Sequence, residues 1–134
     1  MSNRKQASDS LKTFGVGIIL YFILINFYNI SEIKDRIQKA SSIKEEKKSE
    51  LLDLLSTLKF EVEELSKTQA DHAKSITGFT DISIHEATQK NMNPELLELS
   101  IKELSSSVKG FETSHPKLAE IVNSICLTLS NLGI

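Results

Sequence analysis

The chain has 134 residues and a formal net charge of −2 at pH 7, and a quarter of its residues are charged. This length allows one modest domain beside a short extra segment. The small negative charge provides no positive field that would hold a polyanion, so a nucleic-acid partner is not expected. A single cysteine, Cys126, excludes an intramolecular disulfide framework.

The first predicted element is an apolar run over residues 14–30 that contains no charged residue. As a helix it would rise about 26 Å, close to the hydrocarbon thickness of a bilayer. No polar residue interrupts the run before Asn26, whereas a surface helix of a small soluble domain needs a polar face. The residues that follow lack the small-x-small pattern of a cleaved signal peptide. We therefore expect a retained transmembrane helix over residues 13–30, after a short tail over residues 1–12.

The basic residues on either side of this run predict its orientation. Three precede it and six follow it closely, which favours a single-pass protein whose C-terminal domain is cytoplasmic. The opposite topology stays open, because a short basic N-terminal tail often remains inside. The residues counted are Arg4, Lys5 and Lys12 before the run, and Lys34, Arg36, Lys39, Lys44, Lys47 and Lys48 after it.

Two amides lie near the end of the predicted span. Asn26 and Asn29 are three residues apart and so share one helix face. Buried amides could hydrogen-bond between spans and favour self-association. The alternative is that both simply lie at headgroup depth beside Tyr28.

The apolar spacing continues past the membrane through Ile30, Ile33, Ile37 and Ala40, which predicts a juxtamembrane stalk over residues 31–42. The S-x-x-E pattern of Ser42 and Glu45 then predicts a new helix with Ser42 as its N-cap. We expect a soluble α-helical domain over residues 43–134.

Three further signals divide this domain. The helical pattern fades after residue 70, and residues 77–80 (TGFT) predict a break at Gly78, followed by a turn or two of helix over residues 81–89. Asn93 and Pro94 predict a helix start, with Asn93 as N-cap and proline at the first helical position. Residues 110–114 weaken the helix, and Pro116 predicts the start of the last one.

Apolar rows with alternating steps of four and three residues run through the predicted helices, so each helix must bury one stripe. This predicts an all-α fold in which helices form a small bundle or hairpin assembly, completed in part by a second subunit. The predicted helix–helix interface comprises Ile33, Ile37, Leu51, Leu55, Leu58, Val62, Leu65, Leu97, Ile101, Leu104, Val108, Phe111, Leu118, Val122, Ile125, Leu129 and Leu132.

The last 24 residues, FETSHPKLAEIVNSICLTLSNLGI, carry a more specific pattern. They resemble the ending of a family of small uncharacterised bacterial helical proteins, classed only as a domain of unknown function, which close with a similar F-E-x-x-H-P-x-L run and a terminal L-G-I. The resemblance implies a bacterial origin and an all-helical domain, and it implies no activity. The matching positions are Phe111, Glu112, His115, Pro116, Leu118, Leu132, Gly133 and Ile134.

The candidate catalytic and metal-binding residues form no recognisable constellation. His85-Glu86 begins an H-E-x-x-H-like pattern, but Gln89 replaces the second histidine that zinc requires. Cys126 lies beside an apolar stripe, where a thiol packs as a small apolar group. Nucleotide-binding and hydrolase motifs are absent from the sequence. We therefore expect no enzymatic activity, no cofactor, no metal and no small-molecule substrate.

These features predict a non-catalytic, single-pass membrane-anchored adaptor that localises or assembles a complex at the bacterial inner (cytoplasmic) membrane. Its partners would be the membrane and either copies of itself or another protein. The alternative hypothesis is a small membrane effector, of a stress or phage-defence type, that oligomerises through Asn26 and Asn29 and forms a pore in the bilayer or perturbs it.

Overall fold

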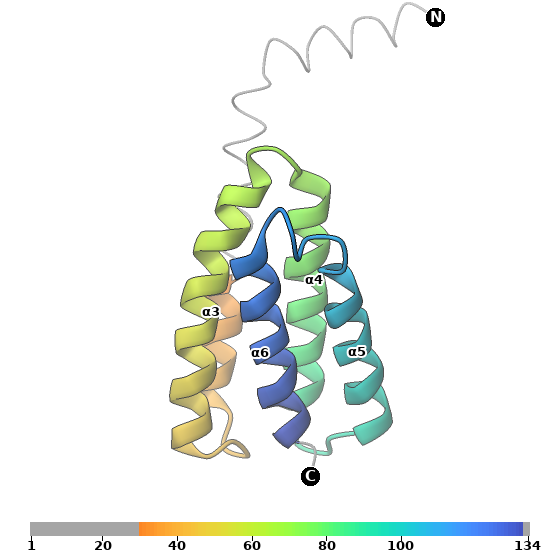
Figure 1. Ribbon diagram of the computed structural model, residues 1–134. Helices are drawn as coiled ribbons and strands as arrows, with labels where there is room; N and C mark the ends of the chain where they lie inside the picture. The colour runs from red at the N-terminus through yellow and green to blue at the C-terminus, as the bar shows by residue number, and fades with distance from the viewer. Residues whose placement is uncertain (1–29, 133–134) are drawn as a thin grey trace, which may run out of the picture.

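The computed structural model describes residues 30–132, which form five helical segments and no strand (Figure 1). The first segment covers residues 30–39 and is called here the 30–39 helix. It is followed by α3 (Glu45–Ser66), α4 (Ala70–Ala87), α5 (Pro94–Ser107) and α6 (Pro116–Leu132). The all-α prediction is therefore confirmed for the described part of the chain.

Successive helices run up and down the long axis of the bundle (Figure 1). Helix α3 packs against α4 and α6, and α5 also packs against α4 and α6. The α3–α4 turn and the α5–α6 connection lie at one end, whereas the α4–α5 connection lies at the other (Figure 1). Short connections make sequential helices antiparallel neighbours, as expected for a helical bundle.

The 30–39 helix belongs to this bundle, because its apolar row is buried there. Ile30, Ile33 and Ile37 are no more than 1% exposed and lie in the same hydrophobic core as the other helices. Polar contacts fix its position. Lys34 Nζ donates to Ser56 Oγ on α3 at 2.7 Å, and Arg36 pairs with Asp81 on α4 at 2.8 Å.

The end of the 30–39 helix is capped from α3. Lys48 is only 9% exposed, and its Nζ donates a hydrogen bond of 3.1 Å to the Gln38 carbonyl oxygen. A cation at the C-terminus of a helix satisfies a free carbonyl and interacts favourably with the helix dipole. Glu45 contacts the same ammonium group at 3.4 Å, so this buried lysine is paired on both sides.

The prediction of a break at residues 77–80 was wrong. Helix α4 continues from Ala70 to Ala87, and Gly78 lies within it on an exposed face. The buried face of α4 carries mostly small and polar residues, among them Thr77 and Thr80, whose hydroxyls donate to backbone carbonyls four residues earlier. Because these side chains are not strongly apolar, the stripe of this helix is weak in the sequence, although tertiary packing maintains the helix.

The predicted helix starts had different outcomes. Asn93 is the N-cap of α5, its side chain accepting from the backbone N–H groups of Glu95 and Leu96, and Pro94 stands at the first helical position as predicted. Pro116 begins α6, also as predicted. Ser42 is not the N-cap of α3; that position is Lys44, with no side-chain cap. The S-x-x-E pattern placed the start two residues too early.

Within residues 30–132, every helix is too short or too polar to traverse a lipid bilayer. The tail predicted over residues 1–12 lies outside the described residues. The span predicted over residues 13–30 does so too, apart from Ile30.

Candidate interaction surfaces

The residues predicted as helix–helix interfaces meet in one core inside this single chain. Most of them therefore stabilise the bundle itself and are not at its surface, where a partner would bind. Ile101 and Leu132 are only partly buried. The fully or nearly fully buried members are Ile33, Ile37, Leu51, Leu55, Leu58, Val62, Leu65, Leu97, Leu104, Val108, Phe111, Leu118, Val122, Ile125 and Leu129.

The two predicted transmembrane association residues, Asn26 and Asn29, lie outside the described residues. Any surface built from the described part of the chain must use other side chains.

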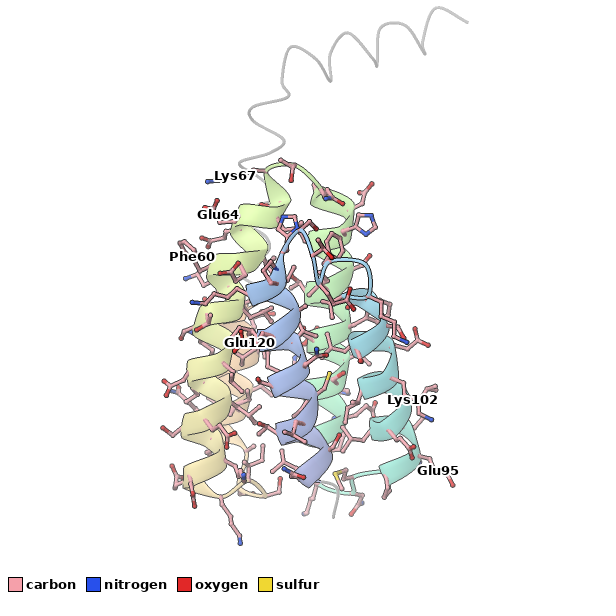
Figure 2. All side chains as sticks on the ribbon, viewed as in Figure 1. Phe60, Glu64, Lys67, Glu95, Lys102 and Glu120 are labelled. Carbon is pink, nitrogen blue, oxygen red and sulfur yellow. The ribbon has the colours of Figure 1, made fainter. Side chains whose placement is uncertain are left out.

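A few large apolar side chains remain exposed on the helices. Phe60 on α3 is 60% exposed and points away from the bundle (Figure 2). Leu96 and Leu99 are both about half exposed, and their spacing of three residues places them on the same face of α5. Ile82 on α4 and Leu127 on α6 complete the set. Single exposed apolar residues are common, whereas Leu96 and Leu99 lie one helical turn apart and so form a small apolar surface.

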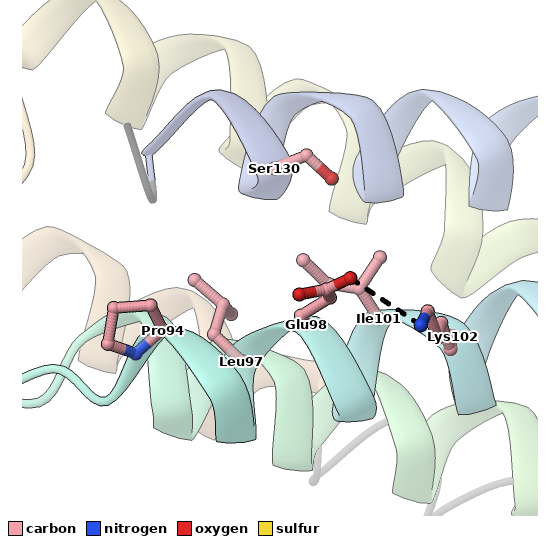
Figure 3. A pocket seen from close by; sticks show the side chains of 6 residues that line it. All are labelled: Pro94, Leu97, Glu98, Ile101, Lys102 and Ser130. Carbon is pink, nitrogen blue, oxygen red and sulfur yellow. Dashed lines mark ion pairs between the residues drawn. The ribbon is translucent and has the colours of Figure 1, made fainter.

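A groove of about 450 Å³ lies between α5 and α6 (Figure 3). Leu97 and Ile101 provide its apolar surface on α5, and the small side chain of Ser130 faces them from α6. The ion pair of Glu98 and Lys102, at 3.5 Å, lies along its edge, and both side chains are about 70% exposed. The remaining lining residue is Pro94.

Cys126 packs at the junction of α5 and α6. Its Sγ contacts the Ile101 carbonyl oxygen at 3.8 Å, and the residue is 8% exposed. Burial raises the pKa of the thiol to about 11. Since the thiolate is the reactive form of cysteine, this environment suits a packing residue and does not activate a nucleophile.

The F-E-x-x-H-P segment holds the α5–α6 connection in place. Phe111 is 8% exposed, and its ring lies edge-on between His72 of α4 and His115, with ring-centroid distances of 5.4 and 5.6 Å. Gly110 has a φ of 96°, which glycine adopts readily. The Gly110 N–H donates to the Glu112 carboxylate at 2.7 Å. The motif residues therefore have a clear structural role in the loop.

Hydrogen bonds from the backbone N–H groups of Glu112 itself and Gly110 lower the pKa of the Glu112 carboxyl, because they stabilise its ionised form. The carboxylate is fully exposed, so it organises the loop without forming a closed binding site.

His85 lies in the last turn of α4, and Gln89 follows two residues after the helix ends at Ala87. The Gln89 Nε2 lies 3.0 Å from the His85 Nε2 and also bonds to the His85 carbonyl oxygen. The amide therefore occupies the position of a second ligand and contacts the ring. Within residues 30–132, the His, Cys, Asp and Glu side chains form no group of three or more that could hold a metal ion.

The groove between α5 and α6 was not predicted from the sequence. Leu97 and Ile101 were recognised as stripe residues, but their stripe does not reveal which helix faces them. The small side chain of Ser130, in the last turns of α6, leaves space opposite Leu97 and Ile101. This can be recognised only when α6 is known to pack beside α5.

Comparison with known proteins identifies one family. Residues 51–134 match the family described as "Domain of unknown function (DUF4404)", which covers more than half of the chain. The resemblance of the C-terminal segment to a domain of unknown function is confirmed at that level, and the individual motif positions remain a prediction. No curated protein and no solved structure matches the chain significantly.

Proposed function

Because this chain belongs to the DUF4404 family, whose description names no activity, we propose a function from its own residues. It is a non-catalytic, single-pass membrane-anchored interaction protein that localises or assembles a complex at a bacterial inner membrane. Its helical domain lies on the cytoplasmic side.

One observation carries this proposal: an uncharged apolar run joins the bundle with no linker between them. Residues 14–29 have the length and composition of a membrane anchor, and Ile30 is already a core residue of the bundle. An anchor attached to a rigid small domain suits localisation and assembly. The basic residues that follow the run favour a cytoplasmic domain.

The burial of the apolar stripes refines where a partner would bind. The stripe residues contribute to the stability of the bundle, so a partner must contact exposed side chains. Among the described residues, Leu96 and Leu99 on α5 offer apolar contact area that can be tested. Apolar anchors of this kind contribute most of the energy of many protein interfaces.

Purification of the full-length protein in mild detergent tests the proposal. A partner protein recovered at fixed stoichiometry, identified by mass spectrometry and mass photometry, is the expected result. The double variant Leu96→Ser/Leu99→Ser should reduce its recovery several-fold. Phe60→Ser is the matched control, because Phe60 is equally exposed but lies on α3. A homo-oligomer without a partner would favour the oligomeric effector over the adaptor.

The alternative function is an oligomeric membrane effector, and Asn26 and Asn29 are the residues that favour it. The two functions differ in what the span must do. An adaptor retains activity when both asparagines are replaced by leucine, whereas an effector that associates through them loses it. Retained activity of Asn26→Leu/Asn29→Leu would therefore exclude the effector.

A further inference from the structure

We propose that an exposed face formed by α4 and α5 binds a basic amphipathic helix of another protein. This face, called here the α4–α5 face, has an apolar centre and an acidic rim. The inference rests on the proposed interaction function, and it names the surface that the domain uses and the chemistry of its partner. The face consists of Ile82, Leu96 and Leu99 in the centre and Glu86, Glu95 and Glu103 around them.

One row of residues on α4 lies along its contact with α5. The ring of His72 contacts Phe111 in the α5–α6 connection, and the two ring centroids are 5.4 Å apart. Phe79 follows His72 by two helical turns, so it lies on the same side of α4, and it is partly buried against the core. Because α4 and α5 are packed neighbours, this row borders α5.

Ile82 and Glu86 continue this row. They follow Phe79 at steps of three and four residues, which keeps them on the same side of the helix. Asp81 lies on a different side, because it pairs with Arg36 of the 30–39 helix at 2.8 Å. Ile82 is 51% exposed, and Glu86 is partly exposed. The side of α4 next to α5 therefore presents an exposed isoleucine and, one turn later, a carboxylate.

Helix α5 presents a matching row toward α4. Leu97 and Ile101 line the groove that faces α6. Leu96, Ser100 and Glu103 are spaced by four and three residues and form a separate row. Ser100 is only 7% exposed although it does not line the groove, so its row borders α4, the other neighbour of α5. Leu96 and Glu103 therefore lie at the edge of the contact with α4.

The apolar residues of the two helices lie at the same level. Helices α4 and α5 are antiparallel and are joined by a short connection (Figure 1). Ile82 stands five residues before the end of α4, and Leu99 stands five residues after the first residue of α5. Leu96 is one turn from Leu99, so the three side chains form one patch. An exposed apolar patch with a polar rim is typical of a protein interaction site.

The rim of this patch is negatively charged. Glu86 and Glu95 stand next to the α4–α5 connection, and Glu103 lies about two turns further along α5. Glu95 points away from the bundle (Figure 2). Within residues 30–132, none of these three carboxylates forms an ion pair. The lysine of α5, Lys102, pairs with Glu98 instead. The rim charges are therefore free to pair with a partner.

This charge decides between the possible occupants. A second copy that used the same face would bring glutamates against glutamates across a two-fold axis, and like charges in an interface oppose binding. Anionic lipid headgroups would be repelled for the same reason. A helix of another protein is complementary when its apolar residues, three or four positions apart, are flanked by lysine or arginine.

The bundle already contains an example of this packing geometry. The 30–39 helix lies along two neighbouring helices, with Lys34 bonded to Ser56 on α3 and Arg36 paired with Asp81 on α4. Its isoleucines supply the apolar contacts, and its basic side chains supply the polar ones. A partner helix on the α4–α5 face would use the same combination.

Photocrosslinking in the cells that produce the protein naturally tests this inference. The photoreactive amino acid p-benzoylphenylalanine replaces Leu99 in the full-length protein. A matched protein carries it in place of Phe60 on α3, because the two positions are 57% and 60% exposed. Products are isolated under denaturing conditions, and the crosslinked segment is identified by mass spectrometry.

The expected product joins residue 99 to a different protein. The crosslinked segment should contain apolar residues every three or four positions, flanked by lysine or arginine. The variant Glu86→Lys/Glu103→Lys should lower the yield of this product several-fold, because repulsion replaces attraction at the rim. The control variant Asp53→Lys/Glu120→Lys changes the net charge equally at exposed sites on α3 and α6, and it should retain the yield.

Four results would overturn the inference. They are a product that joins two copies of this chain, a crosslinked segment without basic residues, equal yields in the two double variants, and a co-purified partner that crosslinks at residue 60 but not at residue 99. The last result would leave the proposed adaptor intact. If no protein co-purifies and none crosslinks at either position, the adaptor itself is contradicted, and the inference with it.

Discussion

Ser83 lies fully buried in the core of the bundle, on the packed face of α4. Its hydroxyl oxygen has no hydrogen-bond partner within residues 30–132, unlike the hydroxyls of Thr77 and Thr80 on the same face. A buried polar group without a partner loses its hydration and gains nothing in return.

Replacing this serine by alanine should therefore stabilise the fold. We expect Ser83→Ala to raise the free energy of unfolding by about 1 kcal/mol, because the unpaired hydroxyl is removed and no large cavity is created. Urea denaturation of the chain from residue 30 onward measures the change. Thr80→Ala is the control and should not stabilise, since the Thr80 hydroxyl donates to the Ile76 carbonyl at 2.7 Å. A loss of stability in Ser83→Ala would contradict the assignment.

The two predicted N-caps can be separated by mutation. Asn93→Ala removes a side chain that accepts two backbone hydrogen bonds at the start of α5, so a loss of about 1 kcal/mol in unfolding free energy is expected. Ser42→Ala should change stability by less than about 0.5 kcal/mol, because Ser42 is exposed and makes no cap. If both variants lost the same free energy of unfolding, Ser42 would act as an N-cap after all, as its S-x-x-E pattern predicted.

Among the helices, the packing of the 30–39 helix in the core can be tested by mutation. Ile33 is fully buried against the bundle, so Ile33→Ala should lower the free energy of unfolding by about 2–5 kcal/mol. Its exposed neighbour Glu32 is the matched control and should have little effect when replaced by alanine. A free stalk would instead tolerate both changes, and chemical denaturation distinguishes the two results.

The elements differ in how well their sequences reveal them. Helix α3 has the leucine row from Leu51 to Leu65, and α5 has the Asn93-Pro94 start, so both were predictable from local signals. Helix α4 was divided in two because threonine and serine occupy much of its buried face. Such residues are buried only because neighbouring helices pack on them, and this information lies elsewhere in the chain.

The 30–39 helix illustrates a second limit of sequence reasoning. The row Ile30, Ile33 and Ile37 was recognised correctly as an apolar seam, but periodicity does not identify the surface that a seam covers. A projecting stalk and a core helix have the same spacing. The polar contacts of Lys34 and Arg36 with α3 and α4, which fix its place, join residues 22 and 45 positions apart.

In the molecule as a whole, the main apolar stripes of the helices are buried against one another in one core. Since these side chains are buried, a partner protein cannot bind to them and must contact other residues. The exposed leucines of α5 and the groove between α5 and α6 are surfaces that follow from helix pairing, so they could not be predicted from the rows alone.

We propose that residues 14–29 anchor this bundle in a membrane, and fractionation of bacterial cells tests this anchoring. The full-length protein should remain in the membrane fraction after alkaline carbonate extraction, whereas the chain from residue 30 onward should be released into the soluble fraction. Membrane retention that depends on residues 14–29 is the predicted result. Release of the full-length protein by carbonate would contradict the anchor and the function built on it.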